Sequence, residues 1–144
     1  MKMLSAILGT LVIVVLWAAQ ARAAEESVIS GSEASGVVSV VDVRSEDGVV
    51  SGIVLNNSNE LARNVQLLIR HTWLWNNERH PGADSPGQAE LYVVPGPVPP
   101  HGNVKFQYQG SPLPERSDGR FTTQVEVVGF TQVGLSDTQP GFQP

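Results

Sequence analysis

Residues 37–55 read VVSVVDVRSEDGVVSGIVL, and this stretch decides the fold class of the chain. Two runs of mostly β-branched residues, 37–44 and 49–55, lie on either side of a short polar segment that ends in Asp47 and Gly48. Asp-Gly between two such runs indicates a β-hairpin, because a two-residue type I′ turn requires positive φ at both central residues. We therefore expect an antiparallel hairpin with Asp47 and Gly48 at its tip.

The rest of the chain continues this pattern of short strands separated by turn-rich connections. Alternating or β-branched runs predict further strands at 65–75, 89–94, 104–108 and 121–130, with Pro, Gly, Ser and Asn concentrated between them. Most of the ten prolines fall in these connections. The chain is therefore expected to be all-β, an immunoglobulin-like antiparallel sandwich of six to seven strands, with a closed barrel as the alternative. We expect the sandwich domain over 37–132, a flexible lead-in over 24–36 and a disordered tail over 133–144.

The first 23 residues have the features of a secretory signal peptide. Lys2 supplies the positive charge, residues 4–17 form an almost unbroken apolar run, and the small residues Ala21 and Ala23 mark a cleavage site after Ala23. The alternative is an uncleaved membrane anchor, but a spanning helix needs about 20 apolar residues and this run is shorter. We expect a leader helix that is cleaved after Ala23, and a periplasmic or secreted mature protein without stable membrane insertion.

Composition narrows the classes of protein to which the mature chain can belong. The sequence contains no cysteine, so disulfides, thiolate nucleophiles, cysteine-bound metals and a lipobox thiol are all excluded. Cleavage after Ala23 would leave 121 residues, which suits one domain with its own hydrophobic core. Removal of Lys2 and Arg22 would leave seven basic against 14 acidic residues. This acidic balance argues against nucleic acid as a partner.

The order of several motifs resembles the FxLYD-type immunoglobulin-like domains of exported bacterial proteins. The motifs that carry the resemblance are Val50-x-Gly52-x-Val54-x-Asn56, Asn64-Val65-x-Leu67, Thr72-Trp73-Leu74-Trp75-Asn76 and Pro100-x-Gly102. In the naming motif Leu74 matches, Trp75 stands for tyrosine, Asn76 stands for aspartate, and Thr72 replaces phenylalanine. The resemblance covers 37–130. It implies a β-sandwich of the cell envelope that has no catalytic activity of its own.

The side chains that could support catalysis or metal binding form no motif. His71, His80 and His101 are the only histidines, and their spacing matches no metal-ligand pattern. Serine never occurs as Gly-x-Ser-x-Gly, and a carboxylate pair such as Glu78 with Asp84 is more typical of a solvated acidic surface. We therefore expect no enzyme activity, no cofactor and no metal site. An enzyme whose site is invisible in a single sequence stays open as an alternative.

Trp73 and Trp75 are the first candidate binding residues. They share one face at the end of the longest expected strand, beside the turn-rich segment 76–87, and could form a platform for a sugar or a Pro-rich peptide. The alternative is that one or both fill the end of the core, because large aromatic side chains near strand ends are usually buried.

A second candidate site is an apolar stripe on the outside of the sandwich. A regular two-residue turn would set Val41 opposite Val54, which leaves both faces of the hairpin apolar, whereas a sandwich sheet normally presents a polar face to water. We therefore expect an outer stripe that contacts a partner protein or a second copy, unless the lead-in or the tail covers it. Its members are Ile53, Leu55, Leu68 and Leu74.

Together these features predict an exported, non-catalytic β-sandwich module for protein–protein interaction or envelope assembly. The partner would be an envelope or extracellular protein, with a second copy of the chain as one form. The rival function is a small-ligand or carbohydrate-binding domain that uses Trp73 and Trp75.

Overall fold

The computed structural model describes residues 24–79 and 84–135. The predicted leader with its cleavage site at Ala23, His80 and the segment 136–144 lie outside the described residues. The described part contains seven strands and one short helix. In chain order they are β1 (Ala24–Ser30), α1 (Gly31–Val37), β2 (Val38–Glu46), β3 (Val49–Asn56), β4 (Leu61–Trp75), β5 (Gln88–Val93), β6 (Asn103–Gln109) and β7 (Gly119–Leu135).

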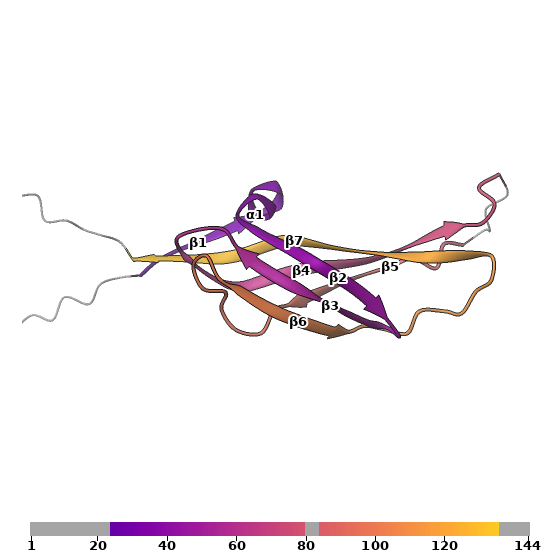
Figure 1. Cartoon of the computed structure of the whole chain (residues 1–144). Helices are drawn as coiled ribbons and strands as arrows, with labels where there is room; N and C mark the ends of the chain where they lie inside the picture. Colours follow the sequence, from indigo (N-terminus) through magenta and orange to yellow (C-terminus); the bar gives the residue numbers. More distant parts are fainter. Residues whose placement is uncertain (1–23, 80–83, 136–144) are drawn as a thin grey trace, which may run out of the picture.

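The seven strands form two antiparallel sheets arranged like a sandwich. The four-stranded sheet has the order β1-β7-β4-β5, and the three-stranded sheet has the order β2-β3-β6. The body is elongated along β4 and β7, and the three-stranded sheet lies across one part of the longer sheet (Figure 1). The prediction of an all-β chain with two antiparallel sheets is confirmed.

The β2–β3 hairpin confirms the expected turn, but its register differs from that of a regular hairpin. Asp47 and Gly48 form the two-residue turn, with φ angles of 49° and 78°. Farther along, the register shifts between Val41 and Arg44, so that Val41 lies opposite Ile53 and not opposite Val54. The shift is a β-bulge around Asp42, whose φ is 53°, and the extra residue moves every later pair by one.

The core lies between the two sheets and is almost entirely aliphatic. Gly52 allows a close approach between β3 and β6, because a Cβ at this position would lie 2.8 Å from the Phe106 ring. The buried members of the core are Ala34, Val38, Val50, Val54, Ala62, Val65, Leu67, Ile69, Val94, Val98, Phe106, Val127 and Phe130.

Residues 24–36, expected as a flexible lead-in, are ordered in the structure as β1 and most of α1. β1 pairs with β7 along its full length, from Ala24 opposite Leu135 to Ser30 opposite Gly129. Its side chains are nearly all exposed, so backbone hydrogen bonds rather than an apolar pattern hold it in place. α1 then crosses from one sheet to the other and buries Ala34. A polar edge strand and a seven-residue helix leave no periodicity that a sequence analysis could detect.

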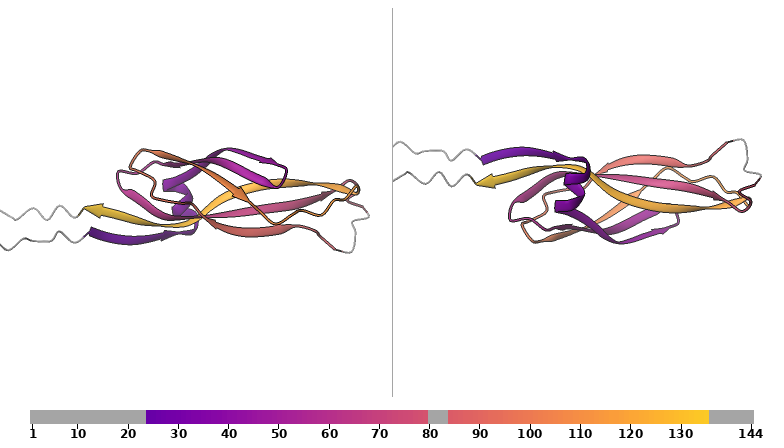
Figure 2. Two further views of the ribbon diagram at one scale, coloured as in Figure 1. Left: turned by 90° about the horizontal axis from the view of Figure 1, so that it is seen from below. Right: turned by 90° about the horizontal axis from the view of Figure 1, so that it is seen from above.

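β7 is longer than the expected strand 121–130. It begins at Gly119 and ends at Leu135, so residues 133–135, expected as part of the tail, pair with β1. β1 and the end of β7 consequently lie side by side at one end of the molecule (Figure 2).

Two polar clusters close the remaining gaps between the sheets. Buried Asn56 donates to the carbonyls of Glu60 and Val98 and accepts from the backbone and hydroxyl of Ser58, which fixes the corner before β4. In the second cluster, Glu90 of β5 accepts a hydrogen bond from the Ser111 hydroxyl at 2.6 Å and another from the Tyr108 hydroxyl at 2.8 Å. These bonds join the edge strands of the two sheets.

Candidate functional site

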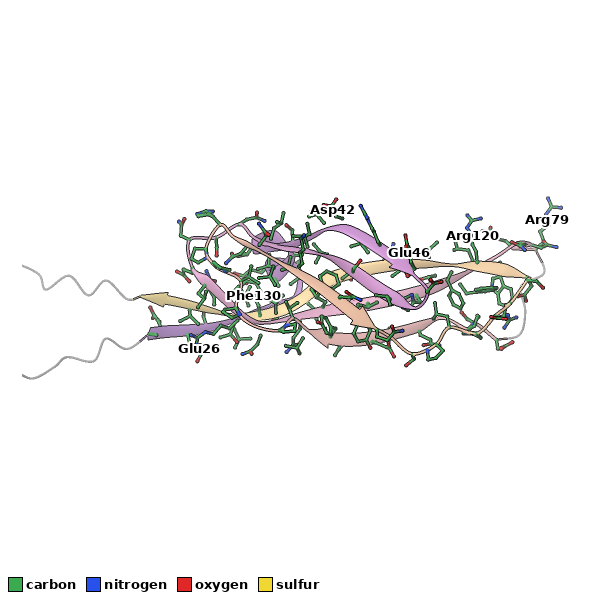
Figure 3. All side chains as sticks on the ribbon, turned by 60° about the horizontal axis from the view of Figure 1, so that its bottom comes forward. Glu26, Asp42, Glu46, Arg79, Arg120 and Phe130 are labelled. Carbon is green, nitrogen blue, oxygen red and sulfur yellow. The ribbon has the colours of Figure 1, made fainter. Side chains whose placement is uncertain are left out.

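Three aromatic side chains gather where β4 ends and β7 begins, at the end of the molecule far from β1. The Trp73 ring lies 4.7 Å from the Phe121 ring and 6.1 Å from the Trp75 ring, both with edge-to-face geometry. Figure 3 places Arg79 and Arg120 at this end and Glu26 at the other. Strand alternation explains the cluster, because Val65, Leu67, Ile69, His71 and Trp73 are all buried on the same face of β4.

Arg116, in the connection between β6 and β7, covers both tryptophans. Its guanidinium carbon lies 5.5 Å from the centre of the Trp73 ring and 5.1 Å from that of Trp75, within the range of cation–π attraction. Asp118 holds it through two hydrogen bonds of 2.9 and 2.6 Å, and Asp84 approaches to 3.5 Å. The hydrogen bonds to Asp118 raise the pKa of Arg116 and lower that of Asp118.

The two predicted platform residues therefore differ in their accessibility. Trp73 is only 6% exposed and takes a core position, whereas Trp75 is half-buried. Arg116 lies over both rings and so covers part of each indole, and half-buried Trp75 is the more accessible of the two. What the cluster offers is a guanidinium backed by indoles and flanked by two carboxylates.

A shallow, open pocket adjoins the buried tryptophan on the β5 side. Its volume is about 270 Å³, and it is lined by Arg70, His71, Thr72, Trp73, Ser85, Gly87, Gln88 and Ala89. Trp73 Nε1 is buried and finds no hydrogen-bond acceptor among the described residues. His71 Nδ1 lies 2.9 Å from the Thr123 hydroxyl oxygen, which fixes the imidazole within the sheet.

The four residues predicted as one outer stripe fall on two different sheets. Ile53 and Leu55 lie on β3, in the three-stranded sheet, and both are half-buried. Leu68 and Leu74 lie on β4, in the four-stranded sheet. In a sandwich the outer faces of the two sheets point in opposite directions, so the structure does not bring these two pairs together. Leu68 and Leu74 are also six residues apart, which is about 20 Å along a strand.

Leu68 nevertheless belongs to a real apolar surface on its own sheet. It lies opposite Leu91 of β5, which is 66% exposed, and Val93 at the end of the same strand is 52% exposed. Val93 and Val128 line a neighbouring groove of about 460 Å³. We call this surface the outer patch, and its members are Leu68, Leu91, Val93 and Val128. Sequence analysis missed three of them, although the alternation of Ala89, Leu91 and Val93 indicates one apolar face.

The two histidines within the described residues do not share a site. His71 is buried beside Thr123, and His101 lies in the connection before β6 with its Nε2 at 2.5 Å from Asn59 Oδ1. Within residues 24–79 and 84–135, no three acidic or histidine side chains come close enough together to hold a metal ion. In the same residues, no helix is long and apolar enough to span a bilayer.

Protein-family models, curated proteins and solved structures were all compared with the chain, and none of them matches it. The likeness to FxLYD-type domains therefore rests on the sequence motifs alone.

Proposed function

We propose that this protein is an exported, non-catalytic, immunoglobulin-like sandwich that binds another protein through the outer patch. The single observation that carries the proposal is the exposure of Leu91 and Val93 on an edge strand, at 66% and 52%. The outward residues of β5 are Ala89, Leu91 and Val93, and none of them carries a charge. An uncharged apolar edge is an aggregation hazard that proteins normally protect, so a partner that covers it provides a physical reason for it.

Strand order supports the immunoglobulin-like part of the proposal. The order β2-β3-β6 corresponds to strands A, B and E of such a sandwich, and β5-β4-β7 corresponds to strands C′, C and F. Each of these neighbouring pairs is antiparallel, as that fold requires. β1 then occupies the position of strand G beside F, although it comes first in the chain.

The geometry of β5 favours an extended partner segment. β5 pairs with β4 on one side, and no other described strand pairs with its opposite edge. An added strand would satisfy the backbone groups of this edge, while its alternate side chains would rest against Leu91 and Val93. The adjacent groove beside Val128 offers room for one further side chain.

Variants on the two sheets test the proposal. The purified protein would be immobilised and exposed to an envelope extract, with Leu91→Asp as the test variant and Val43→Asp on β2 as the matched control. A genuine partner is retained by the wild type and by Val43→Asp and is lost with Leu91→Asp. Adding back the eluted partner should slow amide hydrogen exchange in β5. Retention that is identical for all three proteins, or protection elsewhere only, would contradict the proposal.

A small polar ligand remains the second candidate, and the observation that favours it is the shallow pocket beside Trp73. The Arg70 guanidinium, the Gln88 amide and the hydroxyl groups of Thr72 and Ser85 belong to residues that line this pocket, and together they could hydrogen-bond the hydroxyl groups of a sugar ring. Titration of tryptophan emission with mono- and oligosaccharides tests it. The signal should change at saturable ligand concentration and lose its response in Gln88→Leu.

A further inference from the structure

The first strand of the chain completes the sheet at its last strand. All seven residues of β1 pair with residues 129–135 of β7, and β1 is the edge strand opposite β5. Leu91 and Val93 of β5 therefore lie at the opposite edge of the sheet, although the groove beside Val128 is also lined by Val28, Ile29 and Ser30 of β1.

β1 buries very little of its own surface. Six of its seven side chains are exposed, Val28 is 79% exposed, and only Ile29 packs against the core. Its attachment consists mainly of backbone hydrogen bonds to β7. The same bonds would form if a second copy of the chain supplied the strand. An edge element with few apolar contacts also opens at low free-energy cost.

A single glycine connects β1 to the rest of the fold. Gly31 has a φ of 64°, and a Cβ at this position would meet nothing within 4 Å. Glycine is thus needed there for backbone conformation and not for packing, since residues with a Cβ disfavour the left-handed region. Beyond it, α1 is fixed by buried Ala34. The chain therefore has a natural hinge between a loosely held strand and a firmly held body.

We propose that β1 is exchanged between two copies of this protein, so that β7 of each copy receives β1 of the other in the register seen within one chain. The occupant is known because the structure already shows this segment on this edge, and an identical second copy can make the same bonds. Exchange of an identical element is a low-cost route to a dimer.

Mixed single-cysteine variants test the exchange directly, because the natural sequence contains no cysteine. Ser27 and Gln132 lie opposite each other in the β1–β7 pair. Ser27→Cys and isotope-labelled Gln132→Cys would be unfolded together, refolded at high protein concentration and oxidised. We expect a disulfide-linked dimer with one copy of each kind, at a yield about tenfold above that of a control mixture of Ser27→Cys with Gln124→Cys.

The double variant Ser27→Cys/Gln132→Cys checks that the site itself can form a disulfide. At low concentration it should close within one chain, and once closed it should no longer yield dimers. If it closes while the mixed variants give no more dimer than the control mixture, the proposal is overturned. A dimer linked only through two Ser27→Cys copies would overturn the register.

The hinge provides a second test that uses no disulfide. Gly31→Ala penalises the compact turn but not an extended hinge, so the dimer fraction after refolding should rise about fivefold or more. Gly36→Ala is the matched control, because Gly36 is exposed, has no positive φ and would also meet nothing with its added methyl group. Size-exclusion chromatography with light scattering measures both. An unchanged or smaller dimer fraction in Gly31→Ala would overturn the proposal.

Discussion

The two halves of the long β4–β7 ribbon are held by different chemistry. In the first half, which ends at Ile69, the inner face packs against the three-stranded sheet through aliphatic side chains. In the second half the same face carries His71, Trp73 and Trp75, and it is covered by Arg116 from a connecting segment. Inward and outward side chains alternate along the whole of β4, but the inward side chains pack against aliphatic residues in the first half and against Arg116 in the second.

The aliphatic core of the first half and the aromatic cluster of the second half should therefore have different roles: the core stabilises the fold, and the cluster determines how exposed the far end is. The stabilisation from aliphatic burial has no directional requirement and scales with the apolar area removed from water. The far end depends on ring geometry, a guanidinium and its carboxylates, which are sensitive to salt and to single side chains. Substitutions that only remove side-chain atoms should therefore lower global stability most in the first half, whereas in the second half they should mainly change local exposure.

Leu67→Ala should give the largest effect. Leu67 is fully buried in the aliphatic half, so the loss of its side chain should lower the free energy of unfolding by about 3 kcal/mol. Leu68→Ala is the control on the neighbouring residue of the opposite face and should cost about 1 kcal/mol or less. Urea unfolding followed by circular dichroism measures both. Equal costs would mean that the core does not lie where the burial of β4 places it.

Gly119→Ala should be the most damaging small change at the far end. A Cβ at Gly119 would lie 2.6 Å from Trp73 Cε2 and would also clash with the Leu74 carbonyl, so backbone and ring cannot both stay in place. We expect a loss of about 2 kcal/mol, typical of an overpacked site. Gly36→Ala, in α1 and with open space around the added methyl group, should not lower the unfolding midpoint. The same midpoint for both variants would show that the far end relaxes freely.

Arg116→Ala should change exposure more than stability. Removal of the guanidinium uncovers Trp75, so acrylamide should quench tryptophan emission more strongly and the emission should shift to longer wavelength. Arg120→Ala is the control, because Arg120 lies at the same end, while among the described residues the cation–π contacts to the two indoles come from Arg116. The mature protein is the sample of choice, since it would lack Trp17. Identical quenching in both variants would contradict the covering role of Arg116.

The smallest effect should come from Glu90, near the boundary between the two halves. Hydrogen bonds from Ser111 and Tyr108 lower the pKa of Glu90 below its usual value of 4.5, so its contribution to stability is present above that value. It should be lost as the pH falls through the lower pKa of the folded state. Glu90→Gln should flatten this part of the curve of unfolding free energy against pH. A wild-type and variant difference that is constant from pH 6 to pH 2 would contradict the assignment.

Local signals in the sequence were sufficient for most of the fold. Asp47 and Gly48 specified their turn because few residue pairs adopt positive φ in succession, and the alternation of β4 placed Trp73 with Ile69 on one face. The bulge at Asp42 left no such signal, since the residue that absorbs the extra position depends on contacts across two strands. β1 was missed because an edge strand held by its backbone needs no apolar pattern.

The candidate surfaces were harder to predict for a related reason. Ile53 and Leu68 were each predicted on the outward face of their own strands, and they lie on it. Which sheet a strand joins depends on long-range pairing and not on the local pattern. Arg116 was missed because it comes from a connection of irregular structure, and its approach to the tryptophans is set by Asp118 and by the start of β7.

Ala24 pairs with Leu135, so the first and the last residue that the structure describes lie side by side. A hairpin loop of a few residues between these two positions would join the ends without moving any strand. New ends could then be opened in the turn at Gly48, at the tip of the β2–β3 hairpin, and the resulting permuted chain should fold to the same two sheets. The order of the strands along the chain could therefore be changed without changing their arrangement in the two sheets.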